Sequence, residues 1–182
     1  MQKSIGMVEY NSIARGIYAS DQMVKVSEVE IVTANPVCPG KYITIVHGDV
    51  AAVQTSVETG TRCAGEYLVD SIVIPNVHPD VFPAIVGATV PERIQALGII
   101  ESYSLSAMVI ASDLILKSAE LEPIELRLGT GLGGKAFFTF TGDVAAVQNG
   151  IHVGKEAIGE KGLLNNAEVI PSPSALILDS LF

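Results

Sequence analysis

The sequence predicts an α+β fold that consists of two tandem copies of one unit of about 90 residues. The heptapeptide Gly-Asp-Val-Ala-Ala-Val-Gln at residues 48–54 recurs without change at residues 142–148. Matching residues flank it on both sides, and each copy has the same order of strand-like and helix-like segments. Such an ordered set of matches indicates a duplication. The 182 residues therefore form two small related domains rather than one large domain.

The flanking matches keep their order while the offset between the copies grows from 92 to 94 to 96 residues. The second copy therefore carries two insertions of two residues each. The first falls between Lys117 and Gly134, and the second between Glu160 and Val169. The matches pair Gly6–Glu9 with Gly98–Glu101, Ala19–Asp21 with Ala111–Asp113, Lys25 with Lys117, Gly40-Lys41 with Gly134-Lys135, Gly65-Glu66 with Gly159-Glu160, and Val73–Pro75 with Val169–Pro171.

A segment punctuated by proline and glycine joins the copies between Pro79 and Gln95. Proline and glycine interrupt helices and strands, so this composition is typical of a connection. We expect the first domain at residues 3–83, a linker at 84–94 and the second domain at 95–182.

The first half of each copy predicts a strand, a helix and a second strand. In the first copy, Ile5 to Tyr10 is short and apolar, as in a buried strand. Ser12 is expected to cap a helix that runs to about Lys25, because serine accepts hydrogen bonds from the first turn. Val29 to Thr33 is expected to form the next strand, before a loop that contains Pro36, Pro39 and Gly40.

The second half of each copy predicts a strand, a helix and a closing strand. Tyr42 to Val46 is rich in β-branched residues, which favours a strand. Asp49 is expected to cap a helix, because Val50, Val53 and Val57 follow helical spacing. Ile72 to Ile74 closes the sheet. The order β-α-β-β-α-β is the split arrangement of ferredoxin-like folds, here present twice.

The charge balance excludes nucleic acid as a partner. Lys and Arg number 11 against 20 Asp and Glu, which gives a formal net charge of −9. Such a surface repels phosphate backbones, and no basic run relieves the repulsion. Hydrophobic residues make up 48% of the chain and charged residues only 17%. With so few charges to cover an ordinary surface, much of this surface is expected to contact other protein.

The sequence also argues against a membrane protein. A spanning helix needs about 20 apolar residues in a row, whereas Pro83, Gly87 and Thr89 interrupt the richest stretch, Val81 to Pro91. The N-terminus has no apolar core of a signal peptide, so we expect a cytosolic protein. Two cysteines in a reducing compartment do not form a disulfide framework.

A glycine-rich loop in the second copy resembles two nucleotide-binding patterns. Residues 129–136 satisfy G-x-G-x-x-G, and they would form a phosphate-binding P-loop if Ala136 were serine or threonine. Both motifs require a helix after the loop. The residues after this loop, Ala136 to Phe140, predict a strand instead, which favours a tight connection between two strands.

The set of repeated motifs resembles the bacterial microcompartment shell domain over nearly the whole chain. The motifs are a G-x-x-E strand, an A-x-D-x-x-x-K helix, a G-K loop, a G-D-V-A-A-V helix start and a V-I-P strand. The resemblance implies a non-enzymatic tile of the protein shell around an enzyme compartment. A member with two domains is expected to form a homotrimer that mimics a hexamer and to assemble with other shell proteins.

The resemblance also assigns positions to the pore and to the tile edge. Lys25 and Lys117 are the expected edge lysines. Many members carry an Arg after the V-I-P strand, where it helps to join neighbouring tiles. This chain has Asn76-Val77-His78 and Ser172-Pro173-Ser174 there, so it lacks the arginine of the usual edge contact. The expected lining of the central pore is Val37, Cys38, Pro39, Gly40 and Lys41 from the first copy and Leu132, Gly133, Gly134 and Lys135 from the second.

Cys38 is the expected metal ligand. It aligns with Leu132, so a trimer would present three thiols at its axis, a set that suits a [4Fe–4S] cluster with another ligand on the fourth iron. The Cys-Pro-Gly-Lys loop is most similar to the propanediol-utilisation type of tandem shell protein. That resemblance implies one [4Fe–4S] cluster per trimer, transfer of electrons or of the cluster across the shell, and a redox enzyme, encapsulated or cytosolic, as a partner.

The sequence leaves two alternatives open. Cys38 lines an open metabolite pore without a cluster, or the protein is a cytosolic ferredoxin-like regulator that binds an anion at its glycine loop. Cys63, without a second ligand at helical spacing, is predicted to be a small buried hydrophobic residue. Glu9 and Glu101 recur at equivalent positions, which favours a structural role, and the sequence contains no nucleophile–base pair of an enzyme.

Overall fold

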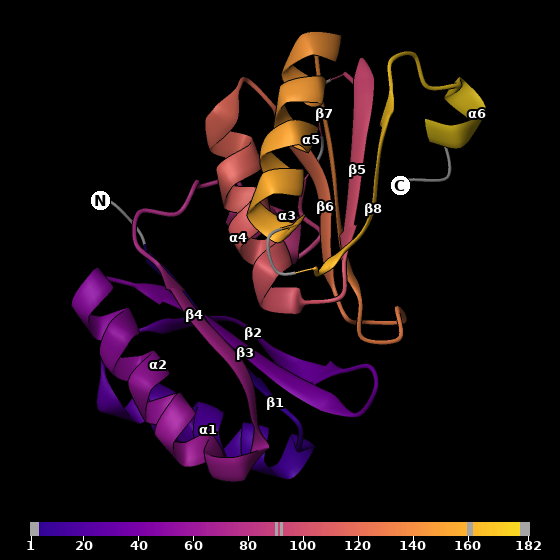
Figure 1. Cartoon of the computed structure of the whole chain (residues 1–182). Coiled ribbons are helices and arrows are strands. Elements are labelled where there is room, and N and C mark those ends of the chain that lie inside the picture. The colour runs from indigo at the N-terminus through magenta and orange to yellow at the C-terminus, as the bar shows by residue number, and fades with distance from the viewer. Residues whose placement is uncertain (1–3, 90, 92, 160–161, 179–182) are drawn as a thin grey trace. The chain divides into compact units, whose positions relative to one another are not determined.

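The computed structural model describes residues 4–89, 91, 93–159 and 162–178. Lys3 and the residues after 178, which lie at the ends of the expected domains, and Glu160 of the repeat are outside the described residues. The chain divides into two compact units (Figure 1). Unit 1 comprises Met1–Pro79 together with Gly129–Gly134, and unit 2 comprises Asp80–Leu128 together with Lys135–Phe182.

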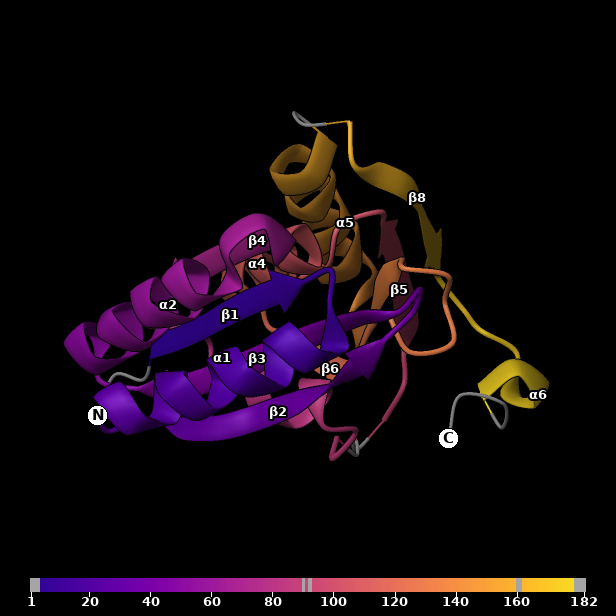
Figure 2. The same ribbon diagram turned by 90° about the horizontal axis from the view of Figure 1, so that it is seen from below.

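Unit 1 contains one antiparallel sheet with two helices on one face (Figure 2). The sheet has the strand order β2-β3-β1-β4, in which β1 and β3 are central and β2 and β4 are edges. This arrangement is the predicted ferredoxin-like split. The elements are β1 (Ser4–Tyr10), α1 (Ile13–Val26), β2 (Glu30–Val37), β3 (Lys41–Gly48), α2 (Val50–Ala64), a 3-10 turn (Gly65–Tyr67) and β4 (Leu68–Ile74).

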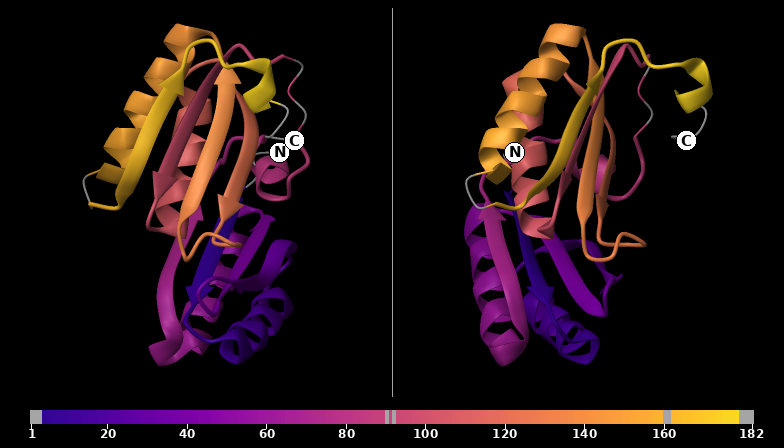
Figure 3. Two further views of the ribbon diagram at one scale, coloured as in Figure 1. Left: turned by 90° about the vertical axis from the view of Figure 1, so that its right-hand side faces the viewer. Right: turned by 45° about the vertical axis from the view of Figure 1, so that its right-hand side comes forward.

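Unit 2 repeats this topology with the strand order β6-β7-β5-β8. Its two long helices lie on one face of the sheet (Figure 3). A short helix precedes the first strand and another follows the last. The elements are α3 (Val81–Ile85), β5 (Ala96–Ser102), α4 (Leu105–Ser118), β6 (Glu122–Leu128), β7 (Ala136–Gly142), α5 (Val144–Gly159), β8 (Leu164–Ile170) and α6 (Ala175–Leu178).

The helix caps agree only in part with their prediction. Ser12 Oγ accepts a hydrogen bond from the Arg15 amide at 3.3 Å, as expected for an N-cap. Asp143 Oδ1 accepts one from the Ala146 amide at 2.8 Å. Asp49 occupies the N-cap position of α2, but its side chain accepts no hydrogen bond from that helix. The position of Asp49 at the start of the helix was therefore predicted correctly, but the expected capping hydrogen bond does not form.

Two edge strands are longer than their sequence suggests. β2 continues to Val37, four residues beyond the expected end at Thr33, and includes Pro36, which pairs with Tyr42. Proline is tolerated there because an edge strand has one side without hydrogen-bonding partners. β4 starts at Leu68 rather than Ile72, because Leu68, Asp70 and Ser71 already pair with residues of β1.

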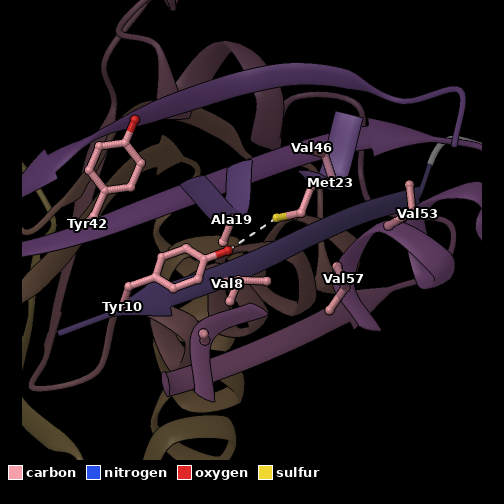
Figure 4. Packing of buried hydrophobic residues seen from close by; sticks show 9 residues of the cluster. Val8, Tyr10, Ala19, Met23, Tyr42, Val46, Val53 and Val57 are labelled. Atoms are coloured by element: carbon pink, nitrogen blue, oxygen red, sulfur yellow. Dashed lines mark hydrogen bonds between the residues drawn. The ribbon is translucent and has the colours of Figure 1, made fainter. Parts of the chain in front are cut away.

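The core of unit 1 fills the space between the sheet and its two helices (Figure 4). The Tyr10 hydroxyl donates a hydrogen bond to Met23 Sδ at 3.3 Å. Burial raises the pKa of Tyr10 well above its usual range, so the phenol stays neutral. Cys63 packs against this cluster as predicted, but it is half-buried rather than fully buried. The cluster contains Val8, Tyr10, Ala19, Met23, Tyr42, Val46, Val53, Val57 and Ala64.

Close packing of α1 on the sheet predicts a steric effect at Gly16. A Cβ atom there would lie 2.6 Å from Cβ, Cγ and Cδ1 of the buried Tyr42. Gly16→Ala should destabilise the protein by about 1–3 kcal/mol, because overpacking outweighs the better helix propensity of alanine. Urea denaturation at one fixed chain concentration measures the change.

Gly159→Ala is the matched control, because Gly159 also lies in a helix and a Cβ there would have no neighbour within 4 Å. It should be neutral or slightly stabilising. Equal effects of the two substitutions would contradict the packing argument.

Candidate functional site

The first predicted pore loop is the connection between β2 and β3. Val37 is buried, Cys38 is half-buried, and Pro39 and Gly40 are exposed at the tip. Gly40 has a φ of 76°, a conformation that glycine adopts without strain. A side chain at Gly40 would have no neighbour within 4 Å, so the space around the loop tip is open.

The second predicted pore loop connects β6 to β7 and contains the first of the two insertions. Strand pairing joins Pro36 to Tyr42 in unit 1 and Leu128 to Ala136 in unit 2. The enclosed segments are residues 37–41 and 129–135, so the second loop is two residues longer. The strand β7 follows it directly. Since the residues that follow the loop form a strand and not a helix, neither nucleotide-binding motif has its required context.

The two loops meet inside unit 1, which includes residues 129–134. The Cys38 amide donates a hydrogen bond to the Gly129 carbonyl oxygen at 3.3 Å. A Cβ atom on Gly134 would lie 3.1 Å from Pro39 Cδ. Gly134 has a φ of 90° and packs closely against the cysteine loop. The residues expected to line one pore are therefore neighbours, although Cys38 and its counterpart Leu132 are 94 positions apart in the sequence.

Each loop lysine forms an ion pair with the glutamate of the first strand of its own repeat. Lys41 Nζ lies 2.8 Å from Glu9 Oε1, and Lys135 Nζ lies 2.9 Å from Glu101 Oε2. Strand register explains both contacts. Glu9 lies opposite Ile43, so Lys41 is its diagonal neighbour, two residues away on the facing strand.

The second repeat has the same register, since Glu101 lies opposite Phe137, two residues beyond Lys135. The glutamates were predicted to be structural, and these ion pairs supply that role. The ion pairing of glutamate with lysine was not predicted from the sequence. The joint recurrence of the G-x-x-E and G-K motifs in both copies could have indicated it.

Hydrogen bonds stabilise the charged forms of the second pair, Glu101 and Lys135. A hydrogen bond from Lys135, supported by one from Asn165, lowers the pKa of Glu101 against the opposing effect of burial. The same carboxylate raises the pKa of Lys135. Both groups are therefore held in their charged forms near neutral pH.

The expected edge lysines lie in the last turns of α1 and α4, apart from the loop residues in each unit. Lys25 Nζ is 2.6 Å from Asp21 Oδ2, and Lys117 Nζ is 2.7 Å from Asp113 Oδ2. A cation in the last turn also interacts favourably with the helix dipole. These contacts explain the repeated A-x-D-x-x-x-K spacing, and the edge role remains a prediction.

The described part of one chain contains no ready-made group of metal ligands. Among residues 4–89, 91, 93–159 and 162–178, no three His, Cys, Asp or Glu side chains gather in a group that could bind a metal ion. Cys38 is a free, half-buried thiol. A [4Fe–4S] cluster needs several thiolate ligands, so any cluster at Cys38 must take its other cysteines from other chains.

Comparison with known proteins gives the family. The model of the bacterial microcompartment (BMC) domain matches residues 4–77 and again residues 96–173. The chain belongs to the BMC-domain family. It is a shell protein with two BMC domains and a structural protein rather than an enzyme.

Relatives match this chain over nearly its whole length or over a single repeat. The shell protein PduT of Citrobacter freundii is 42% identical over 95% of this chain and 94% of its own length. A crystal structure of a microcompartment protein from Desulfitobacterium hafniense has a TM-score of 0.94 at 46% identity, covering 98% of this chain and 99% of that one. The shell protein EutM of Escherichia coli is 38% identical over 44% of this chain and 89% of its own length, which is one repeat.

The family assignment confirms the microcompartment shell as the place of this protein, and members oligomerise and assemble with other shell proteins. It does not support the alternative of a cytosolic regulatory protein. Within the described part of the chain, no helix has the length and apolar character needed to cross a bilayer.

The two ion pairs predict unequal effects when their lysines are removed. The Glu9 side chain is 4% exposed, whereas that of Glu101 is 33% exposed and keeps its hydrogen bond from Asn165. Lys41→Met should cost about 1–3 kcal/mol, because a buried carboxylate loses its partner. Lys135→Met should cost less. Urea denaturation measures both, and the double variant Lys41→Met/Glu9→Gln should recover part of the loss. A larger loss for Lys135→Met would contradict the burial argument.

The lowered pKa of Glu101 predicts a contribution to acid stability. This contribution is fully present above the ordinary carboxyl pKa of about 4.5 and is lost as the pH falls below it through the lowered native value. Thermal unfolding between pH 6 and pH 3 should therefore depend less on pH in Glu101→Gln and in Lys135→Met than in the unmodified chain. An unchanged pH dependence in both variants would show that the pair does not contribute.

Proposed function

We propose that three copies of this chain form a pseudohexameric shell tile whose central pore holds one [4Fe–4S] cluster through Cys38 of each copy. The observation that carries the proposal is the position of Cys38. It is a free, partly accessible thiol in one of two adjoining loops, and the family resemblance assigns both loops to the pore. The tile would transfer electrons, or the cluster itself, across the shell.

The loop residues fit this role. Cys38 supplies one thiolate per chain, so a threefold axis would bring together three. The open space around Gly40 allows a bulky group to approach the loop tip. Lys41 is engaged with Glu9, so its charge is largely balanced within the chain. Polar contacts to a bound cluster would come mainly from backbone amides of the loop.

The remaining assignments follow from the tile. A bound [4Fe–4S] cluster would supply one-electron redox chemistry, and the protein would position it and limit its access to solvent. Partners would be two further copies of the chain, other shell proteins, and a redox enzyme inside or outside the compartment. Lys25 and Lys117 would lie at the tile edge, where each shares its charge with an aspartate of its own helix.

Metal analysis of the trimer tests the proposal. Protein purified without oxygen should contain about four iron and four sulfide ions per trimer, the composition of one cluster. Cys38→Ser should lose the iron, the sulfide and the brown colour while keeping the mass of a trimer. Cys63→Ser is the matched control and should keep the cluster, because Cys63 packs against the core of unit 1.

Other results separate the alternatives. Equal iron in Cys38→Ser and the unmodified chain would overturn the ligand assignment. An iron-free trimer would support an open metabolite pore lined by Cys38. Zinc without sulfide would indicate adventitious metal binding by the thiols.

A further inference from the structure

The long helices α1 and α4 occupy equivalent positions in the two repeats but differ in exposure. Ile17 of α1 is 55% exposed, whereas its counterpart Val109 in α4 is fully buried. The difference extends along one side of the repeat. Ile13, Ile17, Val24 and Ile31 are exposed in unit 1, whereas their counterparts Leu105, Val109, Leu116 and Pro123 are buried in unit 2. We call the four residues of unit 1 the apolar strip.

A segment of unit 2 packs along this side of the second repeat, beside β6 and α4. The helix α3 packs against β6 and α4 and buries Val81 and Ala84. The Thr89 hydroxyl donates a hydrogen bond to the Ile124 carbonyl oxygen of β6. Residues Asp80, Pro83, Ala88, Thr89 and Pro91 line one pocket together with Glu122 and Pro123 of β6.

The covering segment follows unit 1 in sequence. The helix α3 comes directly after β4, the last strand of the first repeat, yet it belongs to unit 2. The segment that covers one repeat is therefore the continuation of the preceding repeat.

The second repeat has an equivalent continuation. Val-Ile-Pro at 73–75 corresponds to Val-Ile-Pro at 169–171, so the segment that contains α6 corresponds to the one that contains α3. At this offset Ile177 is the counterpart of the buried Val81. Yet Leu176 is 82% exposed and Ile177 is 50% exposed. Such an apolar end is expected to pack against other protein.

We propose that the C-terminal segment at residues 171–178 of one copy docks on the apolar strip of unit 1 in the next copy. The segment that follows the first repeat packs on the second repeat. By the same relation, the segment that follows the second repeat is expected to pack on a first repeat. In a head-to-tail ring that repeat belongs to a neighbouring chain, and the contact closes the ring. This inference rests on the proposed trimer and names the contact that joins its chains.

Crosslinking between introduced cysteines tests the contact. The background is Cys38→Ser/Cys63→Ala, which removes the native thiols. Leu176→Cys is combined in one chain with Ile13→Cys, Ile17→Cys or Val24→Cys in turn, and a short bismaleimide is added. All these positions are exposed in the chain, so the substitutions should not disturb folding. We expect covalent dimers and trimers on a denaturing gel, and Glu58→Cys on α2 with Leu176→Cys serves as the control that should not link.

A mixture of two singly substituted, differently tagged chains identifies the partner. Linkage between an Ile17→Cys chain and a Leu176→Cys chain would support docking on a second copy. In the doubly substituted chains, linkage only within one chain would overturn it, because the segment would then cover its own unit 1. If no linkage forms, native mass spectrometry distinguishes failure of the docking contact from failure of the trimer. A trimeric mass without linkage at any of the three positions would overturn the docking but leave the trimer. A monomeric mass would overturn the proposed tile as well.

Discussion

Pairing of the first strand of each repeat with its third strand is the constraint on which the rest of the structure depends. The register places Glu9 opposite Ile43 and Glu101 opposite Phe137. A shift by one residue would move each glutamate to the other face of the sheet and away from its lysine. The central strand thereby holds the base of each predicted pore loop with an ion pair.

Duplication has kept the internal contacts, whereas the surfaces that we propose to meet other molecules differ between the repeats. Both repeats retain the serine helix cap, the glutamate–lysine pair and the aspartate–lysine pair. They differ in loop length, in the exchange of Cys38 for Leu132, and in the exposure of α1 and α4. A homohexamer of single domains must repeat every residue six times around its axis. A fused pair relaxes that requirement, so the proposed trimer would present three thiols at its pore instead of six.

The sequence predicted the fold with little error because the duplication provides two independent instances of each pattern. A motif that recurs in both copies marks a structural requirement, whereas one that differs marks a position open to specialisation. Cys38 was identified in this way. Strand ends were less predictable, as Pro36 in β2 and the start of β4 at Leu68 show. Whether such residues extend a strand depends on its position at the edge of the sheet, which no local pattern records.

The sequence by itself determined the two repeats, the topology of each, the family and the residues of the candidate pore, because these depend on local periodicity and on motifs in fixed order. Only the tertiary structure showed that the two loops are neighbours, that each loop lysine is paired with a strand glutamate, and that the apolar side of α1 lies exposed while that of α4 is covered. These features join residues far apart in the chain, for example 32 and 34 positions in the two ion pairs and 91 positions between Cys38 and Gly129. They depend on strand register and on the packing of one segment over another, and both exist only once the sheets have formed.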